Sequence, residues 1–166
     1  SPIKIPKVMR YIYLILLLIL CNSFIHSQSN IPSQIESSFT AIIVDDIDIS
    51  IQWYKDLLGY ETLNLQKRED MGLRQANLSN EHNALELIEL KSAQSTKELL
   101  SNFPPKTKIK GLFKFGFSVD HFDEWIDHLK HFEVNLVGSV VTDSITNKKM
   151  VVLLDPDGNR IQLFEK

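Results

Sequence analysis

Histidine and cysteine, the side chains that most often bind transition metals, are sparse in this sequence of 166 residues. The one cysteine is Cys21, in an apolar stretch near the amino end, so the later part of the chain holds no thiolate ligand and no disulfide. His128 and His131 are three residues apart and would share one face of a helix, where they could hold a surface metal or, as we favour, simply face solvent. His82 falls in a predicted turn and His121 at the start of a predicted helix.

One passage of ten residues occurs twice with the same pattern. The sequence FTAIIVDDID at residues 39–48 is matched 75 positions later by KFGFSVDHFD at residues 114–123. Both passages run from a β-branched or aromatic stretch through aspartate into a helical pattern. A site between two such halves would draw its residues from corresponding pairs of positions.

The first half predicts a strand at residues 39–44 and then a helix capped by Asp45 and ended by Gly59. Its apolar stripe consists of Ile47, Ile51, Tyr54 and Leu58. Further strands are predicted at residues 61–66, 73–78 and 84–90.

The second half, after a linker at residues 91–111 with one short helix at 96–101, repeats that order. It predicts a strand at 112–119, a helix capped by Asp120, and strands at 134–141, 149–154 and 160–164. The apolar stripe of the helix is Phe122, Trp125, Ile126, Leu129 and Phe132. We therefore predict an α+β domain at residues 38–166, made of two tandem βαβββ units at 38–90 and 112–166. Their curved mixed sheets would enclose a shared cavity, with the helices outside.

Four motifs together resemble the vicinal oxygen chelate superfamily, which includes glyoxalase I, extradiol dioxygenases, fosfomycin-resistance proteins and bleomycin-binding proteins. They are VDDID at 44–48, WYKDLLGY at 53–60, FSVD at 117–120 and DPDGNRIQLFE at 155–165. The resemblance spans about residues 38–166 and implies the same paired βαβββ architecture.

Metal-using members of that superfamily carry four ligands, one on the first and one on the last strand of each unit. The resemblance places these positions at Phe39 and Lys114 on the first strands, and at Glu86 and Gln162 on the last strands. Phe39 has no donor atom and the Lys114 ammonium would repel a cation, so we expect no metal cofactor. A divalent metal is the alternative, if His82 or His121 reaches the cavity.

Alternation along the strands puts Lys114 and Ser118 on one face, and the expected cavity then holds a mixture of polar and apolar groups suited to a small polar ligand. The expected ligand-binding residues are Glu86, Lys114, Ser118, Gln162, Phe39 and, if its register points inward, Arg74. Two alternatives stay open. Glu86 and Lys114 could form an ion pair in a filled structural core, or Glu86 could act as a base with Lys114 stabilising an oxyanion.

Residues 1–27 have the order of a secretory signal peptide: basic residues, an apolar run at 11–21, then small and polar residues up to Ser27. Eleven apolar residues fall short of the roughly 20 that span a bilayer. We expect cleavage near Gln28, a flexible tether at 28–37, and a periplasmic or secreted protein without stable membrane insertion. A retained anchor and lipidation are the alternatives. Cleavage would remove three basic residues and no acidic one, changing the formal charge from −3 to −6.

The absence of a basic block argues against nucleic-acid binding. We expect an exported, metal-free protein that binds a small molecule, like the bleomycin-binding branch of the superfamily. A homodimer is a further expectation, because such proteins often dimerise. The second hypothesis is a metal-dependent lyase or dioxygenase of the glyoxalase type. A purely structural or interaction domain is the third.

Overall fold

The computed structural model describes residues 36–104, 107 and 110–166, and the expected leader and most of the expected tether lie outside them. Residues Ser38–Lys166 form one compact unit. Within the described part of the chain, no helix is both long and apolar enough to cross a bilayer.

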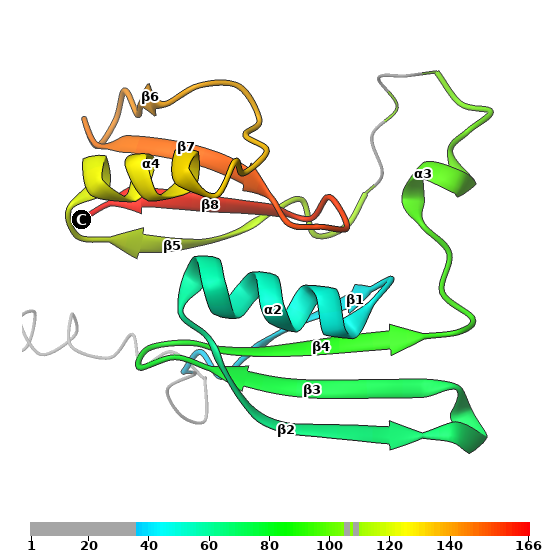
Figure 1. Cartoon of the computed structure of the whole chain (residues 1–166). Helices are drawn as coiled ribbons and strands as arrows, with labels where there is room; N and C mark the ends of the chain where they lie inside the picture. Colours follow the sequence, from blue (N-terminus) through cyan, green and yellow to red (C-terminus); the bar gives the residue numbers. More distant parts are fainter. Residues whose placement is uncertain (1–35, 105–106, 108–109) are drawn as a thin grey trace, which may run out of the picture. The chain divides into compact units, whose positions relative to one another are not determined.

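The first half forms a four-stranded sheet in the order β1-β4-β3-β2 (Figure 1). β1 lies parallel to β4, and the other neighbours are antiparallel. Helix α2 packs along β3 and β4. The elements are β1 (Thr40–Val44), α2 (Ile47–Leu58), β2 (Glu61–Arg68), a short 3₁₀ turn (Glu69–Met71), β3 (Leu73–Ser79) and β4 (Ala84–Leu90).

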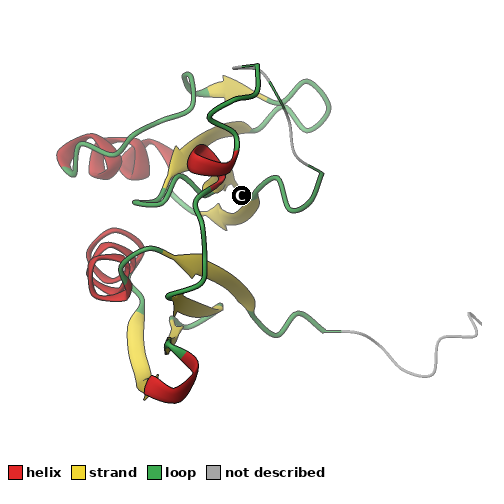
Figure 2. Cartoon of the chain, turned by 90° about the vertical axis from the view of Figure 1, so that its right-hand side faces the viewer, coloured by secondary structure: helices red, strands yellow, loops and turns green. Residues whose placement is uncertain are grey.

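The second half repeats this plan with the order β5-β8-β7-β6, again with a parallel first pair. Its elements are β5 (Phe115–Val119), α4 (Phe122–His131), β6 (Val141–Thr142), β7 (Lys149–Leu154) and β8 (Arg160–Glu165), and the linker carries α3 (Thr96–Leu99). Figure 2 shows one longer helix beside each sheet. The predicted α+β fold of two βαβββ units is therefore confirmed, as two four-stranded mixed sheets that do not close into a barrel.

Both predicted helix caps were misplaced by one residue. Asp46, not Asp45, caps α2, because its Oδ1 accepts hydrogen bonds from the backbone N–H groups of Asp48 and Ile49. The residue before α4 is His121, which is left-handed at φ 53° and makes no side-chain cap. Asp120 lies one residue before that position, and its carboxylate pairs with Lys166 at 2.8 Å. Gly59 ends α2 in the left-handed region, as predicted.

The strands of the second half are shorter than predicted at two places. β5 begins at Phe115 rather than at residue 112, and Leu112 and Phe113 are exposed. The expected strand at 134–141 is reduced to an isolated bridge between Leu136 and Leu153, followed by the two residues of β6. Positive φ angles at Glu133 and Gly138 interrupt the extended chain there.

The core lies between each helix and the face of the sheet that it covers. The fully buried side chains include Ile47, Tyr54, Leu87, Leu153 and Ile161. Of the predicted helical stripes, most members are buried or partly buried, but Phe132 stays 44% exposed because it follows the last turn of α4. The opposite faces of the sheets carry the candidate site.

Candidate functional site

Glu86 lies in the middle of β4, on the face of the first sheet that points away from α2. Its register partners are Ala41 on β1 and Asn77 on β3. The neighbouring residues Leu85 and Leu87 are buried against the helix, so alternation puts Glu86 on the open face. The side-chain amide of Gln75, also on β3, donates a hydrogen bond to Glu86 Oε1. The carboxylate therefore already has a protein partner.

Gln162 occupies the corresponding place on β8, opposite Gly116 of β5. It is only 2% exposed, its Nε2 lies 2.7 Å from Met150 Sδ, and its Oε1 has no hydrogen-bond partner among the described residues. A side chain at residue 116 would not fit, because an added Cβ would lie 2.6 Å from the backbone oxygen of Gln162. Glycine thus allows the close approach of β5 and β8.

Phe39 and Lys114 both lie just before their strands, one residue before β1 and one before β5. Phe39 is 60% exposed, and Lys114 and Ser118 are also exposed. No ion pair joins Lys114 to Glu86 in the described part of the chain. The ion-pair alternative is therefore not formed, since Glu86 is bonded to Gln75 instead.

Arg74 lies on the other face of the first sheet. Its guanidinium contacts Asp48 at 2.8 Å and Glu89 at 3.1 Å, next to the start of α2. Glu89 Oε2 also accepts the backbone N–H of Ile47. Arg74 therefore helps to anchor the helix to the sheet and does not share a face with Glu86.

A divalent metal fits poorly at the four positions that the resemblance suggests. Phe39 has no donor atom and Lys114 carries a positive charge, so neither can bind a cation. The Glu86 carboxylate is already hydrogen-bonded to Gln75, and Gln162 offers only its buried Oε1. Among the described residues, no group of three or more histidine, cysteine, aspartate and glutamate side chains converges. His82 and His121 stay on the surface, with side chains 79% and 77% exposed.

The halves are joined by hydrogen bonds that the sequence did not reveal. Tyr54 on α2 donates to Asp155 Oδ2 at 2.9 Å, and burial together with this carboxylate raises the pKa of Tyr54. The backbone N–H of Asp45 donates to Asp157 Oδ1 at 2.9 Å. His128 Nε2 lies 3.0 Å from the carbonyl oxygen of Leu57, so this imidazole is not simply solvated. Asp155 and Asp157 belong to the DPDGNRIQLFE motif, but only the structure shows their contacts with the first half.

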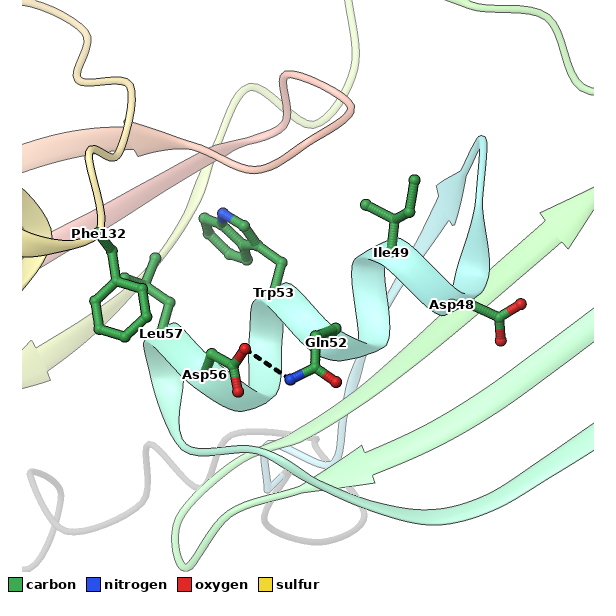
Figure 3. Close-up of a pocket in the computed structure, with 7 residues that line it drawn as sticks. All are labelled: Asp48, Ile49, Gln52, Trp53, Asp56, Leu57 and Phe132. Atoms are coloured by element: carbon green, nitrogen blue, oxygen red, sulfur yellow. Dashed lines mark hydrogen bonds between the residues drawn. The ribbon is translucent and has the colours of Figure 1, made fainter.

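A separate hollow of about 560 Å³ lies on α2, away from the four suggested positions (Figure 3). Trp53, Leu57 and Phe132 give it an apolar floor, and Gln52 donates to Asp56 at 2.6 Å beside it. Asp48, a partner of Arg74, lines its far end. Its two carboxylates, Asp48 and Asp56, are exposed and already have the partners Arg74 and Gln52.

Comparison with known proteins agrees with this architecture. Residues 37–163 match the model of the Glyoxalase/Bleomycin resistance protein/Dioxygenase superfamily. The chain belongs to this superfamily, as the motifs indicated.

Its relatives include two bacterial proteins at about 30% identity. The metallothiol transferase FosB of Staphylococcus epidermidis is 31% identical over 122 residues, which cover 72% of this chain and 74% of that protein. The uncharacterized protein YaeR of Escherichia coli is 30% identical over 126 residues, covering 76% and 92%. A glyoxalase family protein from Enterococcus faecalis shares the fold, with a TM-score of 0.64 at 22% identity over 80% of this chain and 98% of that one.

Proposed function

We propose that this protein binds a small polar molecule on the open faces of its sheets without using a metal. The observation that carries the proposal is the donor set at the suggested ligand positions: Phe39, Glu86, Lys114 and Gln162. Two of these cannot donate to a cation, and a third is held by Gln75. Carboxylate, amide, hydroxyl and ammonium groups among apolar side chains suit hydrogen bonding to an organic ligand.

A metal-dependent reaction is the second candidate, favoured by the 31% identity to a protein named a metallothiol transferase. Metal content distinguishes the two. The protein, purified without chelator, is analysed for bound metal and then titrated with zinc, manganese, iron(II) and nickel. We expect substoichiometric metal and no tight binding. Near-stoichiometric metal that is lost in Glu86→Ala would overturn the proposal and direct the work to lyase and dioxygenase assays.

Binding itself is tested by a thermal-shift screen of small polar molecules. A ligand that raises the melting temperature of the wild type should do so less in Glu86→Gln and in Gln162→Leu. Lys55→Met, an exposed change on α2, serves as the control because it leaves both open faces intact. A ligand that stabilises all four proteins equally would bind elsewhere.

We further propose that the protein is exported and forms a homodimer. The order of residues in 1–27 supports export, and amino-terminal sequencing of the protein from its native cell should find a new terminus near Gln28.

The homodimer is supported by the exposed apolar side chains of Ile43, Leu63 and Leu65 on the first sheet. Light scattering after size exclusion measures the mass, and a mass equal to one chain would contradict the dimer.

A further inference from the structure

A second cavity, of about 570 Å³, lies beside Lys114. It is formed by residues 110–114, which lead into β5, and by Phe115 at the start of that strand. The turn at 157–159, Arg160 at the start of β8, Ile42 of β1, Leu100 and Thr107 complete its lining. Three basic side chains line it, those of Lys110, Lys114 and Arg160, against one acidic side chain, that of Asp157. This clustering is notable in a chain whose formal net charge is −3.

The positive charges of this cavity outnumber the one negative charge of Asp157. In the part of the chain that the structure describes, none of Lys110, Lys114 and Arg160 forms an ion pair, whereas Arg74, Lys149 and Lys166 each do. The oxygens of Asp157 accept hydrogen bonds from the first half, from the Asp45 backbone N–H at 2.9 Å and from the Ser50 hydroxyl at 3.4 Å. Like charges around one cavity repel each other, and a bound anion relieves that repulsion.

Apolar surface adjoins these cations. The guanidinium of Arg160 lies over the ring of Phe113, with Cζ 4.8 Å from the ring centroid. A guanidinium in such a contact can still donate its N–H groups to a carboxylate or phosphoryl group. Phe113 is 57% exposed and Leu112 is 75% exposed, so both offer contact area to the carbon skeleton of a ligand.

We propose that this cavity binds a small organic anion, with its carboxylate or phosphoryl group on Lys114 and Arg160 and its apolar body against Phe113 and Leu112. The inference rests on the proposed function, because Lys114 is common to both, and it adds the charge class of the ligand. Lys114 lies where metal-using members of the superfamily have a metal ligand. Its ammonium group would supply positive charge to the ligand in place of the metal.

The test is calorimetric titration of the full-length protein with matched probes. Benzoate and phenyl phosphate carry the anion and an aromatic body, benzamide carries the body alone, and inorganic phosphate carries the charge alone. We expect benzoate and phenyl phosphate to bind more tightly than either partial probe. Lys114→Met and Arg160→Met should each weaken phenyl phosphate by about tenfold or more, because each removes a charge-assisted hydrogen bond.

Controls separate a charge effect from misfolding. Lys114→Arg keeps the charge and should bind within a few-fold of the wild type, and Lys148→Met, an exposed change outside the lining of this cavity, should bind unchanged. Arg160→Lys keeps the charge but loses the planar group over Phe113, so it should bind between the wild type and Arg160→Met. Binding should also weaken as salt rises. Equal binding of benzamide and benzoate, or unchanged binding in both methionine variants, would overturn the inference, as would no anion binding at millimolar probe.

The failure of this inference is distinguishable from failure of the proposed function. Neutral ligands that bind and are lost in Glu86→Gln would leave small-molecule binding intact while removing the anion preference. Stoichiometric metal lost in Glu86→Ala would remove the metal-free function, whatever the anion titrations show. Equal affinity for inorganic phosphate and phenyl phosphate would remove the part assigned to Phe113 and Leu112.

Discussion

Glu86 and Gln162 occupy corresponding places on the last strands of the two halves, yet their surroundings differ. Glu86 faces Ala41 and is bonded to Gln75, whereas Gln162 faces Gly116 and keeps a buried oxygen without a partner among the described residues. Glu86 and Gln75 lie together on the open face of the first half, whereas Lys114 and Arg160 line a cavity at the second. The repeat therefore fixes the backbone plan, while each half supplies a different chemistry.

The turns before the last strands differ in the same way. Asn80 Oδ1 accepts the backbone N–H groups of His82 and Asn83 in the first half. In the second, Asp155 Oδ1 accepts those of Asp157 and Asn159. Only Asp155 also reaches across to the other half, through Tyr54. One turn is local, and the other holds the two halves together.

Asp155→Ala should produce the largest loss of stability. It leaves the buried Tyr54 hydroxyl and two turn N–H groups without their acceptor, which we expect to cost about 3 kcal/mol or more. Asn80→Ala should cost only about 1 kcal/mol, because its turn is partly solvated. Urea unfolding measures both. Equal losses would contradict the distinction between the two turns.

Tyr54→Phe sharpens this comparison, because it removes only the hydroxyl that crosses between the halves. A double-mutant cycle with Asp155→Ala should show coupling of about 1 kcal/mol or more, since the two groups are in direct contact. The cycle of Tyr54→Phe with Asn80→Ala should be additive.

Substitutions at Ala41 and Gly116 test how closely the first strand of each half approaches the last strand, β1 to β4 and β5 to β8. Gly116→Ala should destabilise by about 1–3 kcal/mol, because the new Cβ would meet the Gln162 backbone oxygen at 2.6 Å. Ala41→Gly, at the corresponding position opposite Glu86, should cost about 0.5–1 kcal/mol through chain entropy alone. Thermal unfolding followed by circular dichroism compares the two. A neutral Gly116→Ala would mean that β5 can move away from β8.

The helix starts give an opposite pair of effects. Asp46→Ala should cost about 1 kcal/mol, because it removes the acceptor for two N–H groups of α2. His121→Gly should be neutral or stabilising by up to about 1 kcal/mol, because glycine tolerates the left-handed angle better than histidine does. Chemical denaturation of both variants decides the point. A loss in His121→Gly as large as that in Asp46→Ala would show that the imidazole stabilises α4.

Most of the fold could be predicted from the sequence because it depends on local patterns. The apolar, turn-bounded segments at 84–90 and 149–154 and the stripe of α2 predicted those elements to the residue or nearly so. The prediction failed where isolated φ angles decide, at Glu133 and Gly138, and at Asp120, whose carboxylate pairs with the distant Lys166. Such contacts join residues far apart in the chain, and no local pattern encodes them.

The candidate site was harder to predict for the same reason. The positions of Glu86 and Gln162 follow from the repeat and the family motifs, but the partner of Glu86 depends on the register of β3 against β4. The face of Arg74 depends on that register as well, and the sequence left it open. Arg160 fell within the predicted strand at 160–164 but was not singled out. Its stacking on Phe113 requires residues 110–115 and the turn before β8 to lie together.

Asp157→Asn tests how the second turn depends on pH. Burial is the main cause that raises the pKa of Asp157 above 3.8, and the nearby carboxylates of Asp155 and Asp45 act in the same direction. A carboxyl whose pKa is higher in the folded than in the unfolded state stabilises the fold below the unfolded pKa. That contribution is lost as the pH rises through the folded pKa.

The Asp157→Asn variant lacks this titration, so its stability relative to the wild type should be greatest at neutral pH and fall on acidification toward about pH 4. Urea unfolding across this range measures the difference. If the stability of Asp157→Asn relative to the wild type instead rises on acidification, the hydrogen bonds from Asp45 and Ser50 outweigh burial. The ionised carboxylate of Asp157 then stabilises the contacts between the two halves.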